Sequence, residues 1–258
     1  LLCFSSTGKV YKLRVFELPM GSRGSRGRPF VNLLPLEQNE RISAVLPIKN
    51  FEDGGYIFMA TRRATVKKTE LAAFANIRSN GIIAVDLRAD DALVGVTLTT
   101  GDDDVLMISD AGRVIRFNEQ GVRAMGRTAT GVRGMRLIAG ASIDGEDDAE
   151  NADAEEAPTA ALPARVIALI KADGGDILTV SEYGYGKRTA MSEYPLRGRG
   201  GQGVIAQALT EKSGRLIGAI PVQDGHEIML VSHAGNLIRV SASEIRTLGR
   251  NTQGVRIA

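Results

Sequence analysis

Arginine and glycine recur together in a short box of the form Arg-x-x-x-Gly. The box occurs at Arg23–Gly27, Arg127–Gly131, Arg199–Gly203 and Arg250–Gly254, with Arg78–Gly81 one residue short. A guanidinium group carries a permanent charge and binds phosphate oxygens, and glycine lets backbone amides approach a phosphate closely. The boxes therefore predict contact with a polyanion and not a chemical reaction.

Most of the candidate anion-binding residues lie in these boxes and in the segments beside them, and Lys187 and Arg188 lie in a recurrent turn phrase. The candidates are Arg23, Arg26, Arg28, Arg78, Arg127, Arg133, Lys187, Arg188, Arg197, Arg199, Arg250 and Arg256. The chain carries 32 basic and 30 acidic residues, but eight of the acids lie in one segment, Asp144–Glu156. Without that segment the balance is 32 against 22, or +10. A periodic excess of positive charge predicts a surface that follows a bent polyanion such as duplex DNA.

A second set of basic residues lies four positions after a recurrent turn, and two interpretations fit it equally well. The set is Lys12, Lys68, Arg116, Arg188 and Arg239, and each has an acid nearby in sequence, namely Glu17, Glu70, Glu119, Glu193 and Glu244. An ion pair that closes each repeat explains these residues as well as a phosphate contact does. The box arginines lack such a recurrent acid, so they are the stronger candidates.

Residues that could support catalysis or metal binding are sparse. His226 and His233 are the two histidines, and their spacing to Cys3 suits neither a metal cage nor a catalytic triad. Cys3 lies in an apolar run typical of a buried thiol, and a single cysteine is consistent with a reducing, cytoplasmic compartment. Gly24–Gly27 and Gly184–Lys187 resemble phosphate loops, but no helix is predicted to follow them. We predict no catalytic residue, metal or cofactor.

The elements that must position the boxes repeat with a period near fifty residues. One phrase, Ser-x-x-Gly followed by an apolar run and a basic residue, recurs with its turn glycine at Gly8, Gly112, Gly184 and Gly235, and Ala64 takes that place in a degenerate copy. The spacings are 56, 48, 72 and 51 residues. Such periodicity is typical of a repeat array.

Each repeat predicts four short strands. An apolar run precedes the turn and another follows it, as in Val105–Ile108 and Val114–Phe117, which predicts a hairpin. A third run begins directly after the box, and a fourth, such as Leu216–Val222, closes the repeat. Four strands per period predict an all-β, propeller-like array in one domain, 1–258. Its five blades are the repeats at about 1–55, 56–104, 105–176, 177–226 and 227–258.

Two segments depart from this plan. Residues 141–163 contain the acidic run and few large apolar side chains, which predicts a disordered insert and accounts for the long third spacing. The insert is interpreted either as a tolerated surface loop or as an intramolecular mimic of DNA. Residues 70–77 favour a short helix. The array begins inside a strand and ends before a fourth strand, so we expect a fragment of a longer chain.

Several phrases resemble the C-terminal domain of the DNA gyrase A subunit, which is part of a type IIA topoisomerase. They are Gly184–Thr189, Thr130–Gly134, Gly249–Val255, and Arg26–Pro29 with Asn32–Leu36, and the resemblance covers the chain apart from the insert. It implies a six-bladed β-pinwheel, in which neighbouring blades exchange a strand and duplex DNA wraps around the basic perimeter. The partners that it implies are the remainder of the gyrase A subunit, through it the gyrase B subunit (in an A2B2 assembly), and double-stranded DNA. It further implies ATP-dependent negative supercoiling and a bacterial cytoplasmic, nucleoid-associated location.

The family's diagnostic box, Gln-Arg-Arg-Gly-Gly-Lys-Gly, belongs to its first blade, which we expect to be missing before Leu1. Degenerate relatives remain at Gly21–Gly27 and Arg197–Gly203. Two alternatives stay open. One is the similar domain of the topoisomerase IV A subunit, and the other is a propeller-type scaffold that binds an acidic protein.

Overall fold

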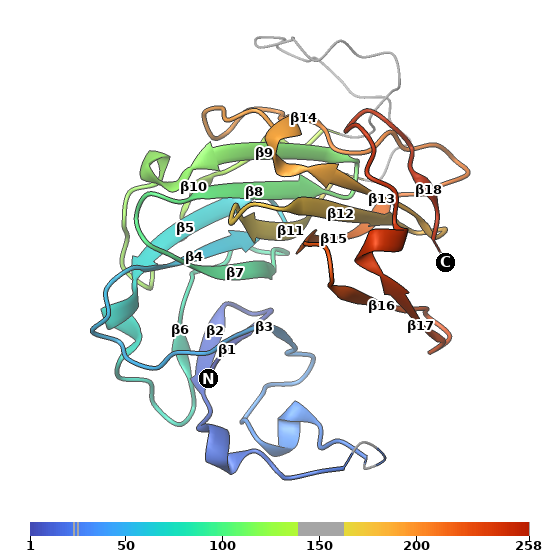
Figure 1. The fold of residues 1–258 in the computed structure, drawn as a ribbon. Helices are drawn as coiled ribbons and strands as arrows, with labels where there is room; N and C mark the ends of the chain where they lie inside the picture. The colour runs from blue at the N-terminus through green and yellow to red at the C-terminus, as the bar shows by residue number, and fades with distance from the viewer. Residues whose placement is uncertain (23, 25, 139–162, 258) are drawn as a thin grey trace.

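The computed structural model describes residues 1–22, 24, 26–138 and 163–257. The described residues form four four-stranded antiparallel sheets and one two-stranded sheet (Figure 1). The predicted all-β architecture is therefore confirmed. Apart from Pro163, the predicted insert at residues 141–163 lies outside the described residues, as do Arg23 and Ser25.

Each four-stranded sheet combines three strands of one repeat with one strand of the next. The first sheet has the order β3-β1-β2-β6, with β1 Leu2–Ser5, β2 Lys9–Lys12, β3 Ile42–Leu46 and β6 Ile82–Ile83. The second has the order β10-β5-β4-β7, with β4 Tyr56–Thr61, β5 Thr65–Glu70, β7 Leu93–Thr99 and β10 Val132–Arg133.

The other sheets repeat this arrangement. The third has the order β11-β8-β9-β14, with β8 Asp104–Ser109, β9 Arg113–Asn118, β11 Val166–Lys171 and β14 Val204–Ile205. The fourth has the order β15-β12-β13-β18, with β12 Asp176–Ser181, β13 Tyr185–Ala190, β15 Leu216–Val222 and β18 Val255–Arg256. The last hairpin pairs β16 Glu227–Val231 with β17 Leu237–Ser241.

The short strand after each box is exchanged between neighbours. β6, β10, β14 and β18 each follow a box in their own repeat, yet each pairs with the hairpin of the preceding repeat. The spacing of the apolar runs predicts this strand but does not indicate which hairpin it pairs with. The family resemblance implied the exchange, and the structure agrees with it.

The boxes lie at the outer edge of the array. β3, β7, β11 and β15 form one end of their sheets, and each contacts the next in the series. These strands gather toward the middle of Figure 1, whereas β10, β14 and β18 lie toward the outside. The exchanged strands, and the boxes that precede them, therefore form the perimeter.

The apolar core lies between adjacent blades. In one cluster, Phe58 and Val66 of the second sheet pack with Val105, Ile115 and Phe117 of the third. Each of these side chains is at most 2% exposed. Equivalent clusters join the first repeat to the second, the third to the fourth and the fourth to the fifth. Burial of apolar surface therefore couples each blade to its neighbour.

A 3-10 helix follows the second hairpin strand in every repeat. These helices are η1 Val15–Glu17, η3 Leu71–Phe74, η4 Glu119–Gly121, η5 Met191–Glu193 and η6 Ala242–Glu244, and η2 Phe30–Asn32 lies in the first repeat. The helix predicted at 70–77 is confirmed as the single turn η3. In the part of the chain that the structure describes, no helix is long and apolar enough to cross a bilayer.

Candidate nucleic-acid interface

In the third, fourth and fifth repeats, both ends of the box segment are fixed to the preceding blade. In the third repeat, Ala124 forms a parallel bridge with Lys68, and Val132 pairs in antiparallel register with Val66. Equivalent bridges join Leu196 to Arg116 and Thr247 to Arg188. The box residues between these two attachments form a loop on the outer edge, where their side chains can meet a ligand that runs around the perimeter.

The box glycine makes this close docking feasible. Gly203 has a φ of +74°, a left-handed conformation that disfavours other residues. A Cβ at this position would lie 2.2 Å from the main-chain oxygen of Val114. At Gly131, with a φ of +110°, the corresponding distance to the oxygen of Val66 is 2.4 Å. Glycine ends the box because the outer strand must begin directly against the preceding hairpin.

In the boxes that begin at Arg127, Arg199 and Arg250, the first arginine donates a hydrogen bond to the outer strand of the preceding repeat. An Nη1 atom donates to a main-chain carbonyl in each case: Arg127 to Ile83 at 3.2 Å, Arg199 to Arg133 at 3.0 Å and Arg250 to Ile205 at 3.5 Å. The sequence predicted only that no acid recurs beside these arginines. The structure shows that their recurrent partner is a main-chain carbonyl. A guanidinium group has five N–H donors, so a carbonyl contact is compatible with a phosphate contact.

The predicted box residues differ in exposure. Arg26, Arg28, Arg78, Arg133, Arg199 and Arg256 are exposed, whereas Arg127, Arg197 and Arg250 are half-buried. Arg23 lies outside the described residues. A groove of about 650 Å³ separates two neighbouring boxes, and Lys9, Arg78 and Arg127 contribute its basic groups. The structure therefore groups cations from three successive repeats around one concave, partly polar surface.

Lys187 requires a correction. It was predicted to contact a ligand directly, but its side chain is fully buried. Its Nζ donates to the main-chain oxygens of Gly249 at 2.7 Å and Arg250 at 2.6 Å. Desolvation by burial lowers the pKa of Lys187 to about 7, Glu193 raises it and Arg250 lowers it. A side chain enclosed in this way supports the loop above it and is not available to the surface.

Arg188 also lies inside the blade. It is 8% exposed and pairs with Asp176 at 2.7 Å and with Asp224 at 2.9 Å. These contacts favour the ion-pair interpretation, although the partner is not the predicted Glu193. Arg116 pairs likewise with Asp104 at 2.8 Å, and Arg239 pairs with Glu227. In these three repeats the acid is the first residue of the hairpin, diagonally across from the base.

The corresponding base of the second repeat links two blades instead. Tyr56 begins this hairpin in place of an acid, and the Nζ of Lys68 lies 4.8 Å from the centre of its ring. The Nζ also lies 3.4 Å from Oε2 of Glu119, which belongs to the next repeat. The ion pair predicted within each repeat is therefore replaced here by a cation–π contact and a pair between repeats.

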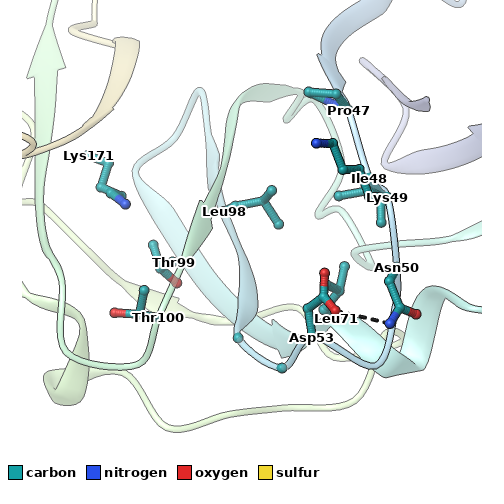
Figure 2. A pocket seen from close by; sticks show the side chains of 12 residues that line it. Pro47, Ile48, Lys49, Asn50, Asp53, Leu71, Leu98, Thr99, Thr100 and Lys171 are labelled. Carbon is teal, nitrogen blue, oxygen red and sulfur yellow. Dashed lines mark hydrogen bonds between the residues drawn. The ribbon is translucent and has the colours of Figure 1, made fainter.

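A second cavity, of about 510 Å³, lies where the first and second repeats connect. Leu71, Leu98, Lys49 and Lys171 are among the residues that line it, and Figure 2 shows Leu98 between Lys171 on one side and Ile48 and Lys49 on the other. Lys171 is paired with Asp173 at 3.1 Å and Asp103 at 3.7 Å. This cavity lacks the box arginines. Among the described residues, no group of three or more His, Cys, Asp or Glu side chains could hold a metal ion.

Four-stranded blades that exchange their outer strand with a neighbour define a β-pinwheel. The chain matches the family described as DNA gyrase C-terminal domain, beta-propeller, at residues 1–49, 55–100, 103–147, 175–223 and 226–258. The chain belongs to this family.

Relatives of known identity agree with this assignment. The chain is 51% identical over 256 residues to the DNA gyrase A subunit of Salmonella typhimurium, covering 99% of this chain and 26% of that protein. The corresponding protein of Escherichia coli is 48% identical, with 27% of its length covered. The chain thus spans about a quarter of these relatives.

Two solved structures share the fold. The C-terminal domain of DNA topoisomerase IV has a TM-score of 0.82 and 25% identity, over 100% of this chain and 74% of that one. The DNA gyrase A C-terminal domain has a TM-score of 0.77 and 24% identity, over 99% and 76%.

Proposed function

We propose that residues 1–258 form a single β-pinwheel domain of five blade repeats that binds double-stranded DNA and wraps it around the outer edge. The observation that supports this most strongly is the recurrence of an arginine-bearing box directly before successive exchanged strands. Cations at equivalent places along a curved edge match the repeating phosphates of a bent duplex.

The contacts are proposed for the perimeter residues alone. They are Arg23, Arg26, Arg28, Arg78, Arg127, Arg133, Arg197, Arg199, Arg250 and Arg256. Lys187 and Arg188 act from beneath the surface. Because the boxes lie on loops and two-residue strands, they reach the sugar–phosphate backbone and read deformability, with little preference for base sequence.

In the whole protein, this domain acts as the C-terminal part of a DNA gyrase A subunit. It holds a duplex segment for an ATP-dependent enzyme that introduces negative supercoils. Its partners there are the rest of the gyrase A subunit, together with the gyrase B subunit, in the bacterial cytoplasm. The 51% identity to a gyrase relative over 99% of the chain favours this assignment over topoisomerase IV. No catalytic role is proposed for the residues of this chain.

Salt titration of duplex binding tests the proposal. Log affinity is expected to fall linearly with log salt, by about 0.9 per neutralised phosphate. A duplex labelled at both ends should bring its labels closer together on binding. Random and fixed sequences should differ by far less than about a thousandfold, the lower end for specific binders. Binding without approach of the duplex ends would contradict wrapping, and preference for an acidic protein over DNA would favour the scaffold alternative.

A further inference from the structure

Two of the box loops each lie against a buried lysine side chain. Lys67 and Lys187 occupy the same place in their repeats, three residues after the turn anchors Ala64 and Gly184. Both lie on the second strand of a hairpin, and their exposed fractions are 1% and 0%. A buried amine is costly unless acceptors surround it, so its contacts indicate what it serves.

Each amine binds the main-chain carbonyl of the first arginine of a box. Lys67 Nζ donates to the carbonyls of Arg127 and of Ala84, the latter at 2.6 Å. Lys187 Nζ donates to the carbonyl of Arg250 at 2.6 Å. Arg127 and Arg250 are the first arginines of their boxes. In each case the lysine therefore fixes the backbone of a residue whose guanidinium lies at the perimeter.

The second loop is held by further bonds. Lys187 Nζ also donates to the carbonyl of Gly249 at 2.7 Å and reaches Thr252 Oγ1 at 3.3 Å. Thr252 Oγ1 donates in turn to the carbonyl of Gly249 at 2.8 Å. The amine and the hydroxyl thus close a small polar network inside the box, on both sides of Arg250.

The third sheet shows that the fold itself does not require a lysine at this place. Ile115 occupies the equivalent position beneath the Arg199–Gly203 box and is 2% exposed. Its Cδ1 lies 3.9 Å from where a Cβ on Gly201 would be. That box is secured by its own arginine, because Arg199 donates to the carbonyls of Gly121 at 2.7 Å and Arg133 at 3.0 Å.

We propose that Lys67 and Lys187 are positioning residues, which hold the box loops in the conformation that presents Arg127 and Arg250 to DNA phosphates. This inference rests on the proposed function. In the second and fourth blades, a buried lysine holds the DNA-binding loop in its binding conformation before DNA arrives. In the third blade, other contacts hold the loop. Preorganisation strengthens binding by reducing the ordering cost at the moment of contact.

A double-mutant cycle on the 258-residue chain tests it, with Lys187→Met, Arg250→Ala and the double variant. Methionine keeps the apolar stem of lysine and removes the amine. In the parent, Arg250→Ala should weaken duplex binding about fivefold and lower the salt slope by about 0.9. Lys187→Met should lower the slope by a similar amount, and Arg250→Ala should then add less than about a twofold loss.

The outcomes separate this inference from the proposed function. If Arg250→Ala leaves the affinity of the parent unchanged, the proposed phosphate contact at that box is wrong. If Arg250→Ala weakens binding but the two losses multiply, the contact stands and the positioning role is overturned. A purely structural lysine would lower the free energy of unfolding and leave the salt slope of the folded protein unchanged.

Two further cycles guard against a folding defect. Lys67→Met with Arg127→Ala repeats the test on the second blade, with coupling again expected. Ile115→Met with Arg199→Ala is the matched control, since no amine is lost there, and its effects should multiply. Coupling in the control as strong as in the lysine cycles would overturn the inference, as would the absence of coupling in whichever lysine variant folds.

Discussion

Replacing Gly203 by alanine is expected to lower the free energy of unfolding by about 3 kcal/mol. The residue has a φ of +74°, and a Cβ would lie 2.2 Å from the oxygen of Val114. The main chain cannot shift to relieve this clash without separating β14 from β9, because Val204 of β14 pairs with Val114 of β9. The alanine therefore weakens the junction between the third and fourth repeats, and chemical denaturation measures the loss.

Gly198 supplies the matched control in the same segment. A Cβ there meets nothing within 4 Å, and its φ is outside the left-handed region. Gly198→Ala should change the free energy of unfolding by no more than about 0.5 kcal/mol. Equal stabilities of the two variants would contradict the docking of the box against the preceding hairpin.

Replacing Asp110 by alanine is expected to cost about 2 to 3 kcal/mol of unfolding free energy. Its carboxylate is 1% exposed and accepts bonds from the backbone N–H of Arg165 at 2.9 Å, from Arg165 Nε at 3.1 Å and from Arg215 Nη2 at 2.9 Å. The two arginines precede the inner strands β11 and β15, so one buried acid joins two blades. Both arginines retain access to water, which keeps the loss below that of a fully buried pair.

Two other substitutions calibrate this effect. Asp110→Asn keeps an acceptor for the backbone of Arg165 and should cost about half as much. Asp173→Ala removes a carboxylate that is 69% exposed and pairs with Lys171, so it should cost no more than about 0.5 kcal/mol. If thermal or chemical denaturation ranks Asp173→Ala with Asp110→Ala, Asp110 is not the link between these blades.

The sequence predicted the strands well because their apolar runs are bounded by turns and boxes. Leu216–Val222 was predicted as a fourth strand and forms β15 with those bounds. The two-residue strand after Gly131 was also predicted, but its partner was not, since Val132 carries no signal that distinguishes its own hairpin from the preceding one. Only the family resemblance implied the exchange.

The candidate site was predictable in its position and less so in its individual contacts. Alternation along a strand assigns residues to faces, but the hairpin strands are covered on both faces by neighbouring blades. Lys187 therefore looked like a surface base and is buried. The acid paired with Arg116 was missed because Asp104 is distant in sequence and becomes adjacent only through hairpin register.

The most direct test of DNA wrapping at the perimeter compares two double charge reversals. Arg78→Glu with Arg133→Glu changes exposed bases of neighbouring boxes and outer strands, whereas Arg41→Glu with Lys49→Glu changes exposed bases that flank the inner strand β3. Both pairs shift the net charge equally, so the salt slope of duplex binding separates location from total charge. The perimeter pair should lower the slope by about 1.8, two contacts of about 0.9 each, and the inner pair should change it little. An unchanged slope for the perimeter pair, or an equal loss for the inner pair, would contradict the proposed path of the DNA.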